Sequence, residues 1–200
     1  MKFDQPGQIQ TALKDYMEFG EVKGFDAKTE ADAGIVVLGN IDAGRFDTNK
    51  NMVEEINPIF RESATLDRFH GLIPGWKIPR MHQGLIADGW ALNTEYFAEV
   101  LHSLRDEMRY SVIVDACLDC PEKPDLRDLT AIKRMCTAFV KLIFPHAERK
   151  EDIKPEEFIK YCLEPSLEMR RSIKKQLCII DPKEFDVPGK RDIPDIKYKY

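Results

Sequence analysis

Apolar residues recur at helical spacing along residues 6–19, where Pro6 suits the first turn of a helix. The pattern consists of Ile9, Ala12, Leu13, Tyr16 and Met17. Gly20 and Gly24 then end it, because glycine disfavours continuation of a helix. We therefore expect one amphipathic helix over residues 6–19.

The following part of the chain is expected to contain extended segments. Residues 21–34 have two short arms around a polar tip, which favours a hairpin. The run IVVLG at 35–39 does not alternate apolar and polar residues, which is typical of a strand buried on both faces of a parallel sheet. Residues 41–60 are loop-like, residues 62–69 favour a short helix, and residues 70–76 (HGLIPGW) form a second apolar extended run.

A long amphipathic helix is predicted to open at Asn93 or Thr94, both suitable N-caps. Its apolar face consists of Tyr96, Phe97, Val100, Leu101, Leu104 and Met108. The sequence SVIVDA at 111–116 is interpreted as the end of this helical segment.

Two more helices are expected further along. One follows Pro124 with Asp125 as N-cap, and its apolar face consists of Leu129, Ile132, Cys136, Phe139, Val140 and Ile143. The other begins at Pro155, is expected to be interrupted at Pro165, and continues through Leu167, Ile173 and Leu177.

These patterns predict an α/β fold that is predominantly helical by residue count. Residues 1–90 would form an α/β core with few strands, and residues 91–180 an all-helical part. Residues 181–200 contain three prolines and no apolar period, so we expect an extended tail there.

Composition places the 200-residue chain among globular proteins, with 43% hydrophobic and 32% charged residues. A net charge of -5 argues against a wholesale nucleic-acid or membrane-surface binder, although it leaves room for a local basic hairpin. No apolar run reaches the length of a membrane span, and the start MKFDQPGQ has no signal-peptide core. We expect a cytoplasmic protein without a membrane partner.

Five cysteines without an export signal favour reduced thiols. Cys117 and Cys120 form the only CxxC motif, and neither a second CxxC nor an HxxxH is present to complete a zinc site. We therefore expect the cysteines to be reduced thiols, buried or partly buried, and we expect no metal site.

Motifs for a nucleophile or a phosphate-binding loop are missing from the chain. GxxxxGK[ST] does not occur, and VPGKRD at 187–192 lacks the hydroxyl residue and a following helix. No serine stands in a nucleophile-elbow context, so neither a Ser/His/Asp triad nor a Ser–Lys dyad is indicated.

Three polar residues stand where nucleotide chemistry would need them. Asn40 follows the expected strand, Arg68 lies in LDRFHG, and Arg127 lies in DLRDLTAIKRM near a helix start. Each residue alone is most often a solvated or salt-bridged surface residue. Their order along the chain is more specific.

The sequences DYMEFGEV, GIVVLGNIDA, LDRFHGLIPGWKIPRM and DLRDLTAIKRM carry a resemblance that runs through nearly the whole chain. They resemble the later part of the AAA+ ATPase module of the BrxL family, the Lon-like proteins of bacteriophage-exclusion (BREX) systems. The same order is similar, more distantly, to the MCM replicative helicases. The resemblance implies a partial AAA+ (P-loop NTPase) core followed by a helical lid.

By this resemblance Asn40 corresponds to sensor 1, which orients the attacking water, and Arg68 to the arginine finger of a neighbouring subunit. Arg127 corresponds to sensor 2, at the start of the lid. The hairpin would enter the channel of a homo-oligomeric ring, where Lys23 and Lys28 would contact DNA phosphates. These roles fit phosphoryl transfer, in which an arginine supplied from outside the site contributes about 10³–10⁵ in rate.

The family's phosphate loop (Walker A), its Walker B motif and its Ser–Lys protease domain have no counterpart in the chain. We therefore expect a fragment that is inactive alone, either the product of a truncated or split gene or a deliberately shortened piece of a longer protein. ATP and Mg²⁺ would bind only to the complete module. Two alternatives remain: a non-enzymatic helical interaction module, and a DNA-contacting module that acts through the hairpin.

Overall fold

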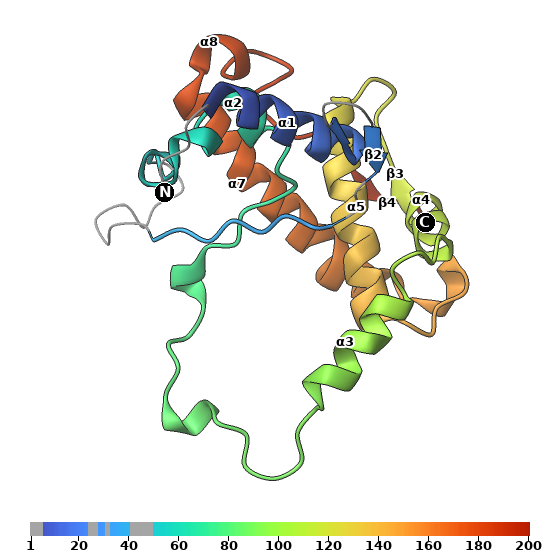
Figure 1. Cartoon of the computed structure of the whole chain (residues 1–200). Helices are drawn as coiled ribbons and strands as arrows, with labels where there is room; N and C mark the ends of the chain where they lie inside the picture. The colour runs from blue at the N-terminus through green and yellow to red at the C-terminus, as the bar shows by residue number, and fades with distance from the viewer. Residues whose placement is uncertain (1–5, 24–27, 31–32, 41–49) are drawn as a thin grey trace. The chain divides into compact units, whose positions relative to one another are not determined.

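The computed structural model describes residues 6–23, 28–30, 33–40 and 50–200 (Figure 1). The chain divides into two compact units. Unit 1 comprises Met1–Gly71 with Arg170–Ile193, and unit 2 comprises Leu72–Met169 with Pro194–Tyr200. Within the described residues most elements are helices, and the strands form only two antiparallel pairs.

Unit 1 begins with α1 (Pro6–Phe19), the helix predicted from the sequence. Gly20 ends it with a positive φ of 67°, and its N–H donates to the Tyr16 carbonyl at 2.9 Å. β1 (Glu21–Lys23) and β2 (Lys28–Glu30) then pair antiparallel, which confirms the expected hairpin.

The rest of unit 1 surrounds a small apolar core. It consists of η2 (Val53–Glu55), η3 (Pro58–Phe60), α2 (Ser63–Leu66), the second half of α7 (Glu164–Ile180) and α8 (Pro182–Phe185). Buried side chains come from every part of this set: Met52, Val53, Ile59, Leu66, Ile173, Leu177 and Phe185.

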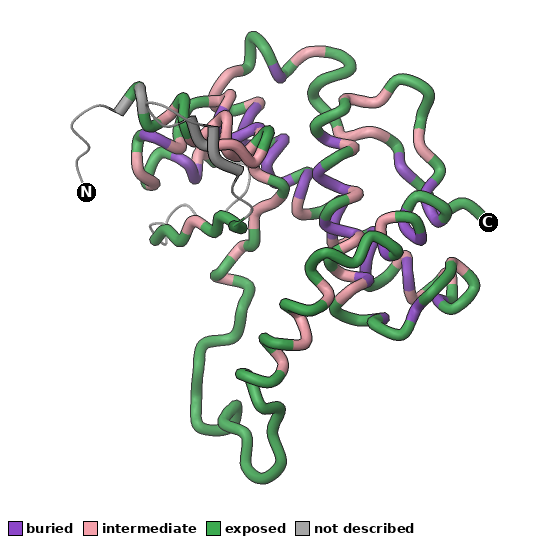
Figure 2. The backbone as a smooth tube through the Cα atoms, turned by 45° about the vertical axis from the view of Figure 1, so that its right-hand side comes forward, coloured by how far each residue is buried: buried purple, intermediate pink, exposed green. Residues whose placement is uncertain are grey.

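Unit 2 is built around α5 (Leu126–Ile143), whose buried face packs against α4 (Arg109–Cys117) and the π-helical segment η7 (Ile159–Leu163). Its core includes Tyr110, Ile113, Val114, Ile132, Cys136, Val140, Phe158 and Cys162 (Figure 2). Asp125 caps α5 as expected, because its carboxylate accepts from the N–H of Arg127 at 2.9 Å. The remaining elements are η4 (Gly75–Lys77), η5 (Gln83–Leu85), α3 (Thr94–Ser103), β3 (Leu118–Asp119), η6 (Lys150–Asp152), α6 (Pro155–Phe158), the start of α7 up to Met169 and β4 (Lys197–Tyr198).

The helix predicted to open at Asn93 is two helices. Asn93 does cap α3, accepting from the Tyr96 N–H at 3.0 Å, but α3 ends at Ser103 and α4 begins at Arg109. Conversely, Pro165 does not interrupt its helix, because the wider π-helical turn η7 precedes it and α6, η7 and α7 run on without a break.

Three extended segments differ from the sequence-based expectation. Residues 33–40 and 70–74 form no strand, and Val36 and Leu38 are 83% and 92% exposed rather than buried. A strand buried on both faces needs neighbours on both edges, and the described residues offer these runs none. Residues 181–200 are not a plain extended tail, because they contain α8 and β4, whose Tyr198 pairs with Leu118 and is buried.

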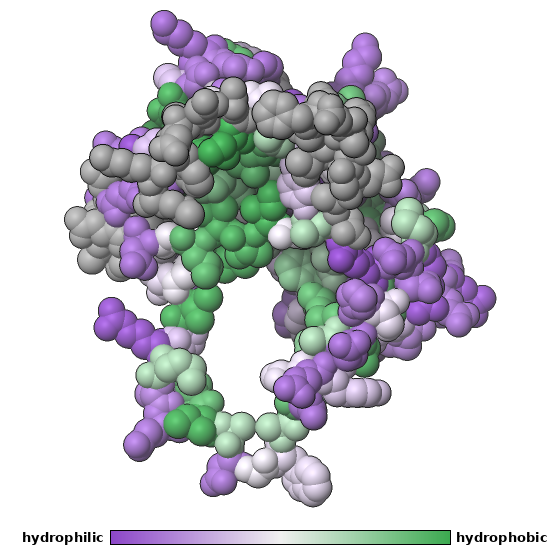
Figure 3. Space-filling view, viewed as in Figure 1, coloured by the Kyte–Doolittle hydropathy of each residue, from purple (hydrophilic) through white to green (hydrophobic). Residues whose placement is uncertain are grey.

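The second half of α7 belongs to unit 1, together with the residues up to Gly71. The boundaries at residues 90 and 180, which follow the AAA+ resemblance, stay a prediction. Within unit 2, residues 73–92 are largely exposed, and their apolar side chains lie at the surface at the bottom of the view in Figure 3. The exposed apolar residues there are Ile73, Ile78, Met81, Leu85, Ile86, Trp90 and Leu92.

Every helix in the described residues is too short or too polar to traverse a bilayer.

Candidate functional site

Arg68 lies in the turn that follows α2, in unit 1. Its Nη1 donates to the Ala64 carbonyl at 2.6 Å, which satisfies one of the free carbonyls of the short helix. Its Nη2 forms an ion pair with Glu18 of α1. The side chain is 14% exposed, so the guanidinium lies close to the surface but is held by groups of its own unit.

A buried arginine holds the backbone on both sides of Arg68. Arg170, on α7, has no exposed surface, and its Nη1 donates to the carbonyls of Asp67 and Phe69 at 3.0 and 2.7 Å. Its Nη2 donates to the Asp67 carboxylate at 2.7 Å, which makes a buried ion pair. Asp67 and Phe69 are the immediate neighbours of Arg68 in the chain, so three hydrogen bonds from one side chain define this turn.

Further contacts hold the ends of the same segment. The rings of Phe69 and Phe60 pack edge to face with centroids 6.0 Å apart. Lys14 of α1 forms an ion pair with Glu62 at 3.0 Å, and the Ser63 hydroxyl lies 3.3 Å from the Asp181 carboxylate. The turn that carries Arg68 is therefore fixed from α1, from η3 and from the chain that follows α7.

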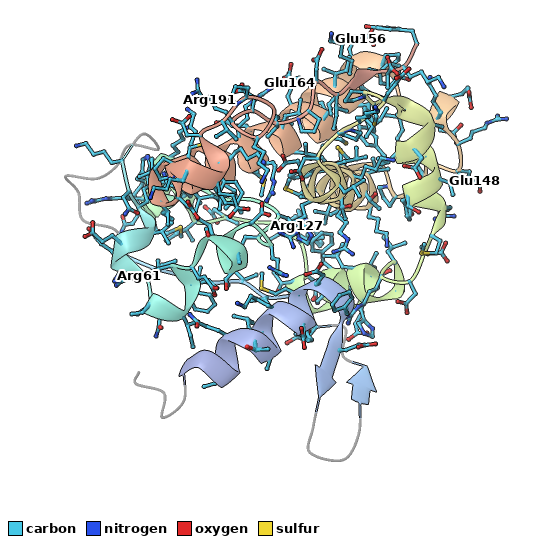
Figure 4. The ribbon with its side chains drawn as sticks, turned by 90° about the horizontal axis from the view of Figure 1, so that it is seen from above. Arg61, Arg127, Glu148, Glu156, Glu164 and Arg191 are labelled. Carbon is cyan, nitrogen blue, oxygen red and sulfur yellow. The ribbon has the colours of Figure 1, made fainter. Side chains whose placement is uncertain are left out.

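Asn40 is exposed and belongs to the irregular run 33–40. Its neighbour Gly39 lies so close to Ile56 that a Cβ at residue 39 would come within 3.0 Å of Ile56 Cγ2. The Ile56 carbonyl in turn accepts from Arg61 Nε at 2.7 Å, and Arg61 is exposed (Figure 4). Arg61, which the sequence did not single out, therefore lies in the surroundings of Asn40.

Arg127 occupies the first turn of α5 in unit 2 and is exposed (Figure 4). Asn40 and Arg68 belong to unit 1, so the structure brings these two into one unit, and the convergence of all three residues around a nucleotide stays a prediction. The hairpin register pairs Lys23 with Lys28 at the end of the ladder nearest the connecting residues.

Three of the four cysteines of unit 2 are buried thiols. Desolvation raises the pKa of Cys117 and of Cys136 to about 11, and that of Cys162 to about 12. A thiol that binds a metal or attacks a substrate has a lowered pKa instead. Among the residues described, no group of three or more histidine, cysteine or acidic side chains is arranged to hold a metal ion.

The family described as "Lon-like protease BrxL-like, ATPase domain" matches residues 1–189 of the chain. The chain belongs to this family. Two curated relatives agree with the BrxL assignment. The Lon-like protease BrxL of Escherichia coli O9:H4 (strain HS) is 30% identical over 176 residues, which cover 86% of this chain and 24% of that protein. The Lon-like protease BrxL of Bacillus cereus (strain H3081.97) is 30% identical over 178 residues, which cover 86% of this chain and 25% of that protein.

The chain thus spans about a quarter of the length of these relatives. Its membership supports an ATPase-related protein and confirms the family resemblance found in the sequence. Arg170 and Glu18 were missed by the sequence-based selection. Arg170 had a usable signal, because it stands at a position of the apolar stripe Leu167, Ile173 and Leu177 where a charged residue needs a buried partner.

Proposed function

We propose that this chain supplies the sensor and arginine-finger residues of an AAA+ ATPase of the Lon-like BrxL type, acting in bacteriophage-exclusion defence. Arg68 would stabilise the charge that develops on the γ-phosphate bound by a neighbouring subunit. Asn40 would orient the attacking water, and Arg127 would contact the nucleotide from the first turn of α5. ATP and Mg²⁺ would be held by a phosphate loop and metal motif that this sequence does not contain.

The observation that carries the proposal is the construction of the Arg68 turn. A finger must present a permanently charged, planar group at a reproducible position. The turn meets this need, because Arg170 binds the carbonyls before and after Arg68 and the guanidinium lies close to the surface. A surface arginine without a function would not require the fully buried Arg170 to hold its backbone, since burying a charge is costly.

The test uses a chimera in which this chain replaces the matching segment of the Lon-like protease BrxL of Escherichia coli. We expect the chimera to assemble and hydrolyse ATP, and Arg68→Ala to lower kcat by about 10³-fold or more without preventing assembly. Arg171→Ala, which removes an exposed arginine on α7 of the same unit, is the matched control and should retain turnover. An assembled chimera that turns over ATP equally well with Arg68→Ala contradicts the proposal and favours a helical interaction module.

A mixing experiment tests action on the neighbouring subunit. Arg68→Ala subunits keep a phosphate loop but lack the finger, whereas subunits with a substituted phosphate-loop lysine have the reverse defect. We expect mixtures of the two to regain part of the activity that each lacks alone. No recovery at any ratio would place Arg68 in the site of its own subunit.

A further inference from the structure

We infer that Arg170 is a positioning residue for the arginine finger: it sets where the Arg68 guanidinium lies without touching the nucleotide itself. This inference rests on the proposed role of Arg68. Arg170 has no exposed surface, so direct contact with a nucleotide is excluded in this arrangement.

The bonds of Arg170 converge on one turn of the backbone. Nη1 donates to the Asp67 carbonyl at 3.0 Å and to the Phe69 carbonyl at 2.7 Å, one on each side of Arg68. Nη2 donates to the Asp67 carboxylate at 2.7 Å. The two carbonyls fix the path of the backbone, and the carboxylate fixes the orientation of the guanidinium that binds them.

Lysine could not reproduce this arrangement. A guanidinium presents several N–H groups in a rigid planar fork, whereas an ammonium group is a single point with rotatable donors. A buried ion pair also often stabilises a fold no more than apolar residues of similar volume do. What the arginine provides and an apolar side chain cannot is a defined backbone position at residues 67–69.

That position matters because a displacement of about 1 Å in a catalytic group can cost on the order of 10²-fold in rate. The finger acts on charge that develops in the transition state, so its misplacement lowers kcat and leaves KM for ATP almost unchanged. A general loss of folding would instead reduce assembly and the number of active sites.

The experiment compares Arg170→Lys with the control Arg171→Ala, which removes the exposed arginine next in the chain. In the chimera we expect Arg170→Lys to lower kcat by about 10- to 100-fold with KM for ATP changed less than about twofold. Mixing with phosphate-loop-deficient subunits should restore part of this activity, as for Arg68→Ala, because the defect lies in the neighbour's site. Hydrogen exchange of the 200-residue chain should show the Arg68 and Phe69 amides exchanging faster in Arg170→Lys than in Arg171→Ala.

The outcomes separate the inference from the proposed function. If Arg68→Ala abolishes turnover while Arg170→Lys leaves kcat within twofold, the positioning role is overturned and the finger assignment stands. If Arg68→Ala has no effect, the finger assignment falls, and the exchange data alone report the structural role of Arg170. Should Arg170→Lys fail to assemble, Asp67→Ala decides, because it removes the carboxylate that orients the Arg170 guanidinium; wild-type kcat and exchange there would overturn the inference.

Discussion

Arg68 and Glu18 form an ion pair that joins the proposed finger to the last turn of α1. One residue separates Glu18 from Gly20, where the chain turns into the hairpin. The Glu18 carboxylate already pairs with the Arg68 guanidinium, so a γ-phosphate would have to compete with it. This ion pair therefore links the position of α1 to the availability of the finger.

Removing this carboxylate should release the finger. We expect Glu18→Ala in the chimera to raise kcat roughly two- to fivefold, which corresponds to an exposed ion pair of about 1 kcal/mol or less. The free energy of unfolding of the 200-residue chain should fall by less than about 1 kcal/mol, measured by urea denaturation. Thr11→Ala is the matched control, because Thr11 is an exposed residue of the same helix whose hydroxyl donates to the Gly7 carbonyl at 3.1 Å. A fall in kcat toward the Arg68→Ala value would show that Glu18 positions the finger rather than restraining it.

The isolated chain should not bind ATP. Its sequence has no GxxxxGK[ST], and finger and sensor arginines alone do not surround a triphosphate with backbone N–H groups and a metal. Isothermal titration calorimetry with Mg·ATP and the purified chain should give no heat of binding at micromolar concentrations. A dissociation constant in the micromolar range would reveal a nucleotide site made from other residues.

We expect the β1–β2 hairpin to bind DNA in a salt-sensitive manner only after the ring has assembled. Lys23 and Lys28 are directly opposite in the register, and like charges at such positions destabilise a strand pair unless an anion offsets them. In the chimeric ring we expect Lys23→Ala and Lys28→Ala to weaken binding of a fluorescent DNA duplex and to reduce its dependence on salt. Lys175→Ala, at an exposed position of α7, should change neither. Affinity that is independent of salt would exclude phosphate contacts by the hairpin.

Alkaline pH should destabilise unit 2 through its buried thiols. Burial raises the pKa of Cys136 to about 11 from an ordinary value of 9.0, and the pKa of Cys162 to about 12. Because the folded pKa values are raised, the unfolded chain loses these protons first, and the free energy of unfolding falls as pH rises from about 9 toward 11 or 12. Each thiol can contribute a slope of up to about 1.4 kcal/mol per pH unit.

Urea denaturation followed at several pH values between 8 and about 11 measures this slope. Cys136→Ala should give a shallower fall than the unsubstituted chain, because one of the groups that titrates differently is gone. Equal slopes for the two chains would mean that Cys136 ionises as readily in the folded protein as in the unfolded one.

Features set by neighbouring residues were predictable from the sequence. The caps Asn93 and Asp125 and the glycine that ends α1 act over a few residues, and all three have the expected role. The hairpin also follows from local sequence. The break between α3 and α4 was not predicted because Leu104 and Met108 continue the apolar spacing across it. The continuity through Pro165 was not predicted because a π-helical turn leaves no clear mark in the apolar pattern.

Features set by contacts between distant residues were harder to predict from the sequence. The run 35–39 has the composition of a buried strand, but composition does not supply the neighbouring strands that would bury it. The partner of Asp67 lies 103 positions further along the chain, so only the placement of Arg170 in an apolar stripe hinted at it. The roles of Asn40, Arg68 and Arg127 came from the family resemblance, and their joint action is a prediction.

The second half of α7 provides the side chains that complete a unit begun more than a hundred residues earlier. Gln176 accepts from the Met52 N–H at 2.8 Å and donates to the Lys50 carbonyl at 2.9 Å, while Arg170 binds the turn around Arg68. During synthesis on the ribosome, residues 50–71 therefore emerge long before the groups that satisfy them. A nascent chain that stops short of residue 177 would have its early segments translated but unable to reach their native arrangement, and such products should be substrates for chaperones and quality-control proteases.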